Sequence, residues 1–213
     1  MIVDERIITF INSLDTKNSE ILEDIEREAL ADNVPIIRRE MQSFLKVLLM
    51  VKKPMRVLEV GTAVGFSALL MSEYVPEECA ITTIENYEKR IPIARQNFVR
   101  AGKEKKITLL EGDAMDVLKT LEGPYDFIFM DAAKGQYIHY LPEILRLLAK
   151  GGILVSDNVM QDGDVIESRF AVERRDRTIH ARMREYLYTL THHEELTTAV
   201  LPIGDGITVS VKK

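Results

Sequence analysis

The stretch that decides the fold is Arg56-Val57-Leu58-Glu59-Val60-Gly61-Thr62-Ala63-Val64-Gly65. A short apolar run ends in two glycines spaced Gly-x-x-x-Gly, and an apolar helical segment near 66–74 follows. Glycine here lets the chain turn sharply from a strand into a helix and approach a ligand closely. The spacing differs from the Gly-x-Gly-x-x-Gly of dinucleotide-binding proteins. The stretch therefore predicts a strand, a ligand-binding loop and a helix.

The same alternation continues along the chain. Apolar runs predict buried strands at 57–60, 80–84, 107–110, 127–130 and 153–156, with helices near 66–74, 87–101, 114–121 and 137–148. Two β-rich runs at 196–203 and 207–211, joined by Gly204-Asp205-Gly206, predict an antiparallel hairpin at one sheet edge. We expect an α/β fold with a mostly parallel sheet of these seven strands, covered on both faces.

The flanking segments are helical. Apolar residues at helical spacing predict helices within residues 1–53, interrupted at Asn33-Val34-Pro35. The charged segment from Val165 to Leu190 is interpreted as one amphipathic helix with its lead-in. Repeats, low-complexity tracts and linkers are absent, so residues 1–213 are predicted to form a single domain. It consists of an N-terminal helical cap, 1–53, and an α/β core, 54–213.

Composition narrows the class of protein. The 213 residues are 46% apolar and 29% charged, as in ordinary globular proteins. No run approaches the roughly 18 apolar residues of a membrane span, and a signal peptide is not recognisable. The single cysteine, Cys79, excludes an internal disulfide and a cysteine-based zinc site. We expect a cytoplasmic protein without membrane partners, and the net charge of −6 gives no global sign of nucleic-acid binding.

Acidic residues lie on or just after three successive predicted strands. Glu59 precedes the glycine loop, where a carboxylate suits the ammonium of an amino-acid moiety better than a pyrophosphate. Glu85 follows the second strand, where a carboxylate can accept both hydroxyls of a ribose. Gly112-Asp113-Ala114 ends the third strand, at a position suited to an adenine ring. The structural alternative is that Gly61 and Gly65 only relieve a strand–helix turn, but three acidic strand ends favour a nucleoside-bearing cofactor.

Oxygen ligands follow the next two strands. Asp131 ends the fourth strand and the pair Asp157-Asn158 ends the fifth, so the three side chains can meet at one sheet edge. Two carboxylates and an amide, without sulfur, favour Mg²⁺ or another hard divalent cation. Lys134 lies three residues beyond Asp131, where a lysine beside a dication can act as general base. Alternatively, the two aspartates merely end strands, Asn158 caps a helix, and the lysine is a surface charge.

Taken together, these motifs resemble those of the cation-dependent O-methyltransferases, a family that includes the catechol and caffeoyl-CoA enzymes. The resemblance covers nearly the whole chain and rests on Leu58-Glu59-Val60-Gly61, Gly65-Phe66-Ser67-Ala68, Ile84-Glu85, Gly112-Asp113-Ala114, Asp131-Ala132-Ala133-Lys134 and Asp157-Asn158-Val159. It implies the class I S-adenosylmethionine (SAM)-dependent methyltransferase fold and, as in most family members, a homodimer.

The resemblance also implies roles for particular residues. Asp131, Asp157 and Asn158 would bind the metal, and Lys134 would be the base. For SAM, the implied contacts are Ile36, in a lid formed by Val34-Pro35-Ile36, together with Glu59, Gly61, Ser67, Glu85, Asp113, Ala114 and Asp131. Of these, Glu85 would hold the ribose, whereas Ser67 and backbone groups near Gly61 would hold the methionine end.

Within the family, the chain is most similar to the bacterial tRNA 5-hydroxyuridine methyltransferases, which make 5-methoxyuridine at the wobble position. This finer resemblance adds Gly135-Gln136-Tyr137 and Pro202-Ile203-Gly204-Asp205-Gly206. The 5-hydroxyl is enol-like, and a neighbouring carbonyl oxygen offers a second metal contact, as in a catechol. The resemblance therefore implies the anticodon loop of tRNA as partner.

Charge patterning gives an independent indication of RNA binding. Residues 165–190 hold six arginines against four acids, and a second arginine pair follows the implied lid. Arginine suits phosphate contacts and stacks on unpaired bases. The arginines that we predict to contact RNA are Arg38, Arg39, Arg169, Arg174, Arg175 and Arg177. The structural alternative is a solvated helix face with internal ion pairs. Two other functions stay open: a methyltransferase for small catechols, and a non-catalytic protein that binds SAM or RNA.

Overall fold

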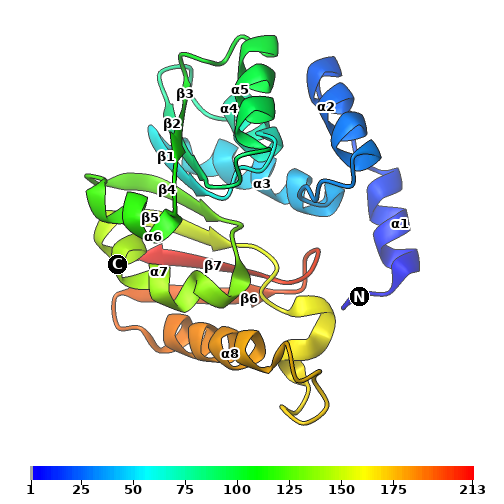
Figure 1. The fold of residues 1–213 in the computed structure, drawn as a ribbon, viewed down its shortest axis with the longest axis vertical. Coiled ribbons are helices and arrows are strands. Elements are labelled where there is room, and N and C mark those ends of the chain that lie inside the picture. Colours follow the sequence, from blue (N-terminus) through cyan, green and yellow to red (C-terminus); the bar gives the residue numbers. More distant parts are fainter. Residues whose placement is uncertain (1) are drawn as a thin grey trace.

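The central sheet is built from the predicted apolar runs. A computed structural model describes residues 2–213. The strand order is β3-β2-β1-β4-β5-β7-β6; the first five strands are parallel, and β7 runs antiparallel between β5 and β6 (Figure 1). This arrangement confirms the predicted mostly parallel sheet with a C-terminal hairpin. The strands are β1 (Arg56–Val60), β2 (Ala80–Glu85), β3 (Ile107–Glu111), β4 (Tyr125–Met130), β5 (Leu148–Ser156), β6 (Leu196–Leu201) and β7 (Ile207–Lys212).

Helices cover both faces of the sheet. Helices α2 to α5 contribute to one hydrophobic cluster and α6 to α8 to the other. The α-helices are α1 (Glu5–Ser13), α2 (Glu20–Ala31), α3 (Arg39–Lys52), α4 (Phe66–Glu73), α5 (Ile91–Arg100), α6 (Ala114–Thr120), α7 (Tyr137–Leu147) and α8 (Arg177–His192), and the 3₁₀ helices are η1 (Lys134–Gln136) and η2 (Gln161–Ile166). Within residues 2–213, none of the helices has the length and apolar character needed to cross a membrane.

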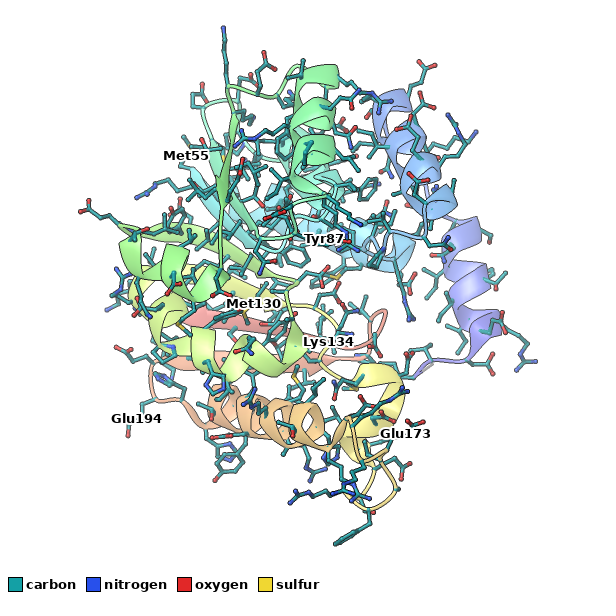
Figure 2. The ribbon with its side chains drawn as sticks, in the orientation of Figure 1. Met55, Tyr87, Met130, Lys134, Glu173 and Glu194 are labelled. Carbon is teal, nitrogen blue, oxygen red and sulfur yellow. The ribbon has the colours of Figure 1, made fainter. Side chains whose placement is uncertain are left out.

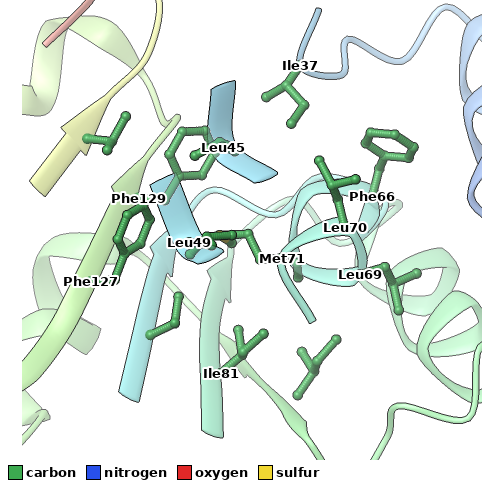
Figure 3. Close-up of a cluster of buried hydrophobic side chains, with 14 of the residues drawn as sticks. Ile37, Leu45, Leu49, Phe66, Leu69, Leu70, Met71, Ile81, Phe127 and Phe129 are labelled. Carbon is green, nitrogen blue, oxygen red and sulfur yellow. The ribbon is translucent and has the colours of Figure 1, made fainter. Parts of the chain in front are cut away.

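Each central strand divides its side chains between the two clusters. In β4, Phe127 and Phe129 pack with α3 and α4, whereas Ile128 and Met130 pack with α7 and α8. All four are completely buried. Figure 3 shows the first of these clusters, with Phe127 and Phe129 beside Leu45 and Leu49 of α3 and residues of α4. The continuous apolar run of β4 therefore reflects a strand that is covered on both faces, which is typical of parallel sheets.

The strand register aligns the carboxyl ends of four strands. Val60 of β1 pairs with Ile84 of β2 and with Met130 of β4, and Met130 pairs with Ser156 of β5. The residues immediately after these four strand positions therefore lie in a row along one sheet edge. They are Gly61, Glu85, Asp131 and Asp157. The strand order reverses between β1 and β4, and ligands of open α/β sheets bind at such a switch point.

Two helices start later than predicted. Helix α5 begins at Ile91 rather than Tyr87, because Pro92 favours the first turn of a helix and the preceding residues form a turn. Helix α8 begins at Arg177 rather than near Val165, and the segment before it consists of η2 and separate turns. In that segment, Ile166 and Phe170 are exposed and only Val172 is buried after η2. Without an apolar stripe to bury, this stretch lacks the packing that stabilises most protein helices.

Candidate functional site

A cavity of about 560 Å³ lies at the aligned carboxyl edge, bounded also by the segment 35–38 that precedes α3. Its volume falls within the range of small-molecule sites. Tyr87, which follows β2, and Lys134, which follows β4, both line the cavity and are labelled in Figure 2. The structure brings most of the predicted site residues together on its wall: Ile36, Gly61, Ser67, Glu85, Ala114, Asp131, Lys134, Asp157 and Asn158.

Gly61 joins the glycine loop to the end of β4. Its φ is +95°, and a Cβ at this position would lie 2.3 Å from the carbonyl oxygen of Asp131. Any other residue would therefore both strain the backbone and collide with it. The glycine predicted from the sequence is required by this close approach, which also holds the loop beside Asp131.

Glu85 is held in place by backbone donors. Its Oε2 accepts a hydrogen bond from Ala63 N at 2.8 Å, and its Oε1 accepts from Asn86 N at 3.0 Å and Tyr87 N at 2.9 Å. The carboxylate thus links the glycine loop to the turn after β2 while it lines the cavity. A carboxylate has about four acceptor sites, so about one remains available to a ligand hydroxyl.

Glu59 and Asp113 lie beside the cavity rather than on its wall. Glu59 is completely buried and accepts hydrogen bonds from Ser67 at 2.5 Å and from Thr83. Burial raises the pKa of its carboxyl to about 7. Asp113 instead caps α6 by accepting from Met115 N at 2.8 Å, and it lines a neighbouring cavity. In this structure Glu59 orients Ser67 and Asp113 fixes the helix that follows Ala114, so neither side chain lines the cavity that the predicted cofactor contacts share.

Asp131 and Asp157 are two neighbouring carboxyl groups in a poorly solvated place. Burial raises the pKa of Asp131 to about 6, an effect that the nearby Lys134 opposes. Burial, and next the charge of Asp131, raise the pKa of Asp157 to about 7. Two like charges taken out of water are stabilised by a cation between them. Asn158, which adopts a left-handed φ of +55°, adds an amide to the same wall.

The ends of β4 and β5 are fixed to each other below these carboxyls. The hydroxyl of Tyr137 lies 3.1 Å from the carbonyl oxygens of both Met130 and Asp157. Tyr137 is completely buried and packs edge-on against Tyr186 of α8, with ring centroids 5.5 Å apart. The backbone that carries the two aspartates is therefore rigidly supported.

Lys134 begins η1, immediately after the loop that follows β4. Its Nζ lies 3.6 Å from Oδ2 of Asp205, and 34% of its side chain is exposed. It lines the same cavity as Asp131 and Asp157. The lysine thus belongs to the same part of the cavity wall as the two carboxylates.

The structure adds residues that the sequence patterns did not single out as site residues. Asp205 from the β6–β7 turn and Asp162 from η2 both line the cavity, as does Tyr140 of α7. The sequence contains one signal for Asp205, an acid between two glycines in a turn that predicts a hairpin and that also carries part of the finer family resemblance, but neither pattern assigns Asp205 to the site. Nothing in the linear pattern predicts that this turn returns to the ends of β4 and β5.

The predicted RNA-contacting arginines are distributed over three places. Arg38 lines the cavity and forms an ion pair with Asp162 at 3.7 Å. Arg39 lies in the N-terminal cap, where it pairs with Glu23 and Glu26.

The other four arginines precede or begin α8. Arg169 and Arg174 are exposed, and Arg175 pairs with Glu173 and Asp176. Arg177 donates to the carbonyl oxygen of Val172 at 3.2 Å. The structure therefore does not gather these arginines into one patch.

The cavity has two chemically distinct halves. The glycine-loop half, formed by Gly61, Ser67, Glu85 and Ala114, offers backbone groups, a hydroxyl and an oriented carboxylate. The carboxylate half, formed by Asp131, Lys134, Asp157 and Asn158, offers oxygen ligands and an amine. Among residues 2–213, no group of three or more His, Cys, Asp and Glu side chains forms a metal site. The candidate ligand set on the cavity wall is smaller: it consists of the carboxylates of Asp131 and Asp157 and the amide of Asn158, which leave positions open for water and substrate.

Comparison with known proteins agrees with this arrangement. The sequence profile of an O-methyltransferase family matches residues 12–213. The chain is 33% identical to caffeoyl-CoA O-methyltransferase 2 of Populus trichocarpa over 177 residues, which cover 78% of this chain and 70% of that protein. It is 35% identical to catechol O-methyltransferase of Niastella koreensis over 128 residues, but the match spans only 58% of each.

A solved structure resembles the whole fold. The methyltransferase PaMTH1 of Podospora anserina, bound to S-adenosylhomocysteine (SAH), superposes with a TM-score of 0.89 at 27% identity, and 98% of this chain and 94% of that chain are covered. The family match, the fold and a cavity suited to a nucleoside cofactor at the switch point agree. The chain belongs to the SAM-dependent O-methyltransferase family that includes the catechol and caffeoyl-CoA enzymes.

Proposed function

We propose that this protein is a Mg²⁺- and SAM-dependent O-methyltransferase that methylates the 5-hydroxyl of 5-hydroxyuridine at the wobble position of tRNA, producing 5-methoxyuridine. The main observation in favour of metal-dependent methyl transfer is the alignment of the carboxyl ends of β2, β1, β4 and β5. Register places Glu85 and Gly61 next to Asp131 and Asp157, so the glycine-loop half and the carboxylate half share one cavity.

The carboxylate half fits a divalent cation. Asp131 and Asp157 have raised pKa values because their surroundings desolvate both carboxyls and, for Asp157, because of its neighbour's charge. With Asn158 they would hold Mg²⁺ through three oxygens. A bound divalent cation lowers the pKa of a substrate hydroxyl and fixes its position.

The protein's own groups supply proton removal and orientation. Methyl transfer replaces the O–H bond with an O–CH₃ bond, while the S–CH₃ bond of the sulfonium breaks and leaves a thioether. Lys134 accepts the hydroxyl proton at Nζ. Glu85 binds the ribose hydroxyls, and Ser67, held by Glu59, binds the methionine end together with backbone groups near Gly61. Ile36 covers the cavity and helps to exclude water.

The tRNA assignment draws support from exposed side chains in the segment that follows η2. Arg169 and Arg174 are exposed in the segment between η2 and α8, and Phe170 between them is 85% exposed. Exposed arginine and aromatic side chains suit phosphates and unpaired bases. Arg38 at the cavity wall adds a positive charge beside the site. These features suit an anticodon loop whose modified base enters the cavity.

The direct test is methyl transfer from tritiated SAM to tRNA taken from cells that lack this protein. We expect the label in 5-methoxyuridine, and only when Mg²⁺ is present. Label in another nucleoside would contradict the substrate, and full transfer in EDTA would contradict the metal dependence.

A second candidate function is methylation of small catechol-like diols. The specific observation in its favour is the similarity to proteins named as catechol and caffeoyl-CoA O-methyltransferases. The same residues would perform the reaction, so the arginines distinguish the two functions. Charge reversal at Arg169 and Arg174 should abolish transfer to tRNA and leave transfer to a free catechol unchanged. Efficient catechol methylation with no transfer to tRNA would favour the small-molecule function, whereas SAM binding without any metal-dependent transfer would indicate a non-catalytic protein.

We further propose that the protein is a homodimer joined through its N-terminal helices. None of the α1 residues is buried, and the exposed apolar side chains Ile7, Phe10 and Ile11 lie on that helix. Helix α3, which α1 contacts, exposes Val47, Met50 and Val51. Such an apolar surface is unusual for a monomer. Light scattering should give twice the chain mass, and Phe10→Glu should give the monomer mass.

A further inference from the structure

The β6–β7 turn reaches from the edge of the sheet into the carboxylate half. Asp205 in this turn is only 4% exposed and lines the cavity. Its position is fixed by backbone hydrogen bonds: Met160 N donates to the carbonyl oxygen of Asp205, and Val159 N to that of Gly206, both at 2.9 Å. Gly206 has φ of +78°, and a Cβ there would lie 2.3 Å from the Cγ of Met160. The turn is thus packed tightly against the loop that follows Asn158.

The two oxygens of Asp205 face different partners. Oδ1 accepts the backbone N–H of Asp162. Oδ2 lies 3.6 Å from Nζ of Lys134. One buried carboxylate therefore connects the loop after β4, which carries Lys134, with the loop after β5, which carries Asn158.

We propose that Asp205 is a positioning residue that acts through Lys134. The inference rests on the proposed function, in which Lys134 accepts the hydroxyl proton. Lysine has a flexible four-carbon side chain, so its amine needs a partner to stay in one place. Asp205 is buried and fixed on its other side by the N–H of Asp162, and it supplies that partner at the cavity wall.

The same carboxylate has a chemical consequence. During the reaction the proton moves from the substrate hydroxyl to Nζ, and a positive charge forms on Lys134 while the methyl group leaves the sulfonium. A fixed carboxylate next to the amine stabilises this charge, as the aspartate of a Ser-His-Asp triad stabilises the imidazolium. Asp205 does not have to accept a proton itself. It orients the base and compensates the charge that the base acquires.

The variant Asp205→Asn separates the effect of the negative charge of Asp205 from the effect of its hydrogen bond with Asp162. Asp205→Asn keeps the size and an oxygen that can accept the N–H of Asp162, but removes the negative charge. We expect kcat to fall about 10- to 100-fold, as for other residues that orient a reactive group, with the KM for SAM unchanged. The matched control is Asp164→Asn, an exposed acid in η2 two residues from Asp162, which should leave kcat unchanged.

A double-mutant cycle shows whether the effect passes through the lysine. In a Lys134→Gln background, Asp205→Asn should cause no further loss, because the group that it positions is gone. Equal fold-losses in both backgrounds would overturn the proposal and leave Asp205 as a purely structural residue. Wild-type protein that transfers methyl neither to tRNA nor to catechols would instead contradict the proposed function.

The ion pair between Asp205 and Lys134 can also be tested by a measurement that does not depend on enzymatic activity. Lys134 is partly exposed, so an amine-reactive ester can acylate it, and mass spectrometry of the peptide measures the rate. The rate at Lys134 should rise in Asp205→Asn and stay unchanged in Asp164→Asn, with the exposed Lys119 as an internal reference. An unchanged rate at Lys134 in Asp205→Asn would contradict the pairing.

Discussion

The two halves of the cavity differ in how their carboxylates are satisfied. In the glycine-loop half, Glu85 accepts three backbone hydrogen bonds and Glu59 accepts two from hydroxyl groups. In the carboxylate half, Asp131 and Asp157 are neighbours of like charge, and both pKa values are raised. The first half is therefore organised by its own hydrogen bonds, whereas the second needs a cation to become electrostatically balanced. Each half should respond to mutation independently of the other.

The largest effect is expected at Asp157. Asp157→Ala removes a carboxylate from the proposed metal ligands, and the stabilisation that a cation provides is worth several kcal/mol. We expect kcat to fall by about 10³-fold or more, with SAM affinity close to that of the wild type. Radiolabelled methyl transfer and calorimetric SAM titration measure the two quantities. A large loss of SAM affinity would mean that the halves are not independent.

Loss of the base should have the next largest effect. Lys134→Ala should lower kcat by about 10²- to 10⁴-fold, the usual contribution of a general base, and leave Mg²⁺ binding intact. Stopped-time methyl transfer at saturating SAM measures this loss. If the rate stays at the wild-type value, Lys134 does not act in the reaction.

The glycine-loop half is tested by Glu85→Gln. The substitution keeps the shape but removes the charge that accepts the ribose hydroxyls, and hydrogen bonds to charged groups are the stronger ones. We expect SAM affinity to fall about 10- to 100-fold, with kcat at saturating SAM close to that of the wild type. Calorimetry measures the affinity, and exposed Glu88→Gln on the same turn is the matched control. Equal SAM affinities for Glu85→Gln and wild type would exclude the ribose contact.

The smallest effect concerns stability and pH. Folding raises the pKa values of Asp131, Asp157 and Glu59 to about 6, 7 and 7, respectively. Between about pH 4 and 7 the folded chain therefore holds protons that the unfolded chain releases. The free energy of unfolding without metal should fall as the pH rises through this window and level off above it.

Mg²⁺ should oppose this fall, because it stabilises the charged forms of Asp131 and Asp157. Thermal unfolding at pH 5 and pH 8, in EDTA and in Mg²⁺, measures the effect, which we expect to be a few degrees. Asp157→Asn should reduce both the pH dependence in EDTA and the response to Mg²⁺. A melting temperature in EDTA that rises from pH 5 to pH 8 would contradict the sign.

Much of the fold follows from local patterns in the sequence. The five parallel strands and the hairpin were predicted because apolar runs of strand length alternate with helical segments, and β4 with Phe127 and Ile128 buried on opposite faces shows why the runs are continuous. The start of α5 was predicted four residues too early, at Tyr87 instead of Ile91, although Pro92 favours a first helical turn. The start of α8 could not be predicted, because charge content alone does not show that Phe170 is exposed and has nothing to pack against.

The sequence predicts those site residues that come at the end of a strand or directly after it. Strand pairing aligns Ile84, Met130 and Ser156, and the residues that follow them are Glu85, Asp131 and Asp157. Once the strands are predicted, the sequence therefore also predicts that these three acidic residues lie in a row along one sheet edge. Glu59 has the right residue type, but its burial and its bond to Ser67 depend on packing. Asp205 could not be placed, because its approach to Lys134 depends on how the hairpin folds back across the sheet edge.

The central claim is that one half of the cavity binds SAM and the other binds a divalent cation. Calorimetric titration of Mg²⁺ and of SAM into wild type, Asp157→Ala and Glu85→Gln tests it most directly. We predict that Asp157→Ala loses Mg²⁺ binding and keeps SAM binding, whereas Glu85→Gln keeps Mg²⁺ binding and binds SAM about 10- to 100-fold more weakly. Unchanged Mg²⁺ binding by Asp157→Ala would contradict the claim.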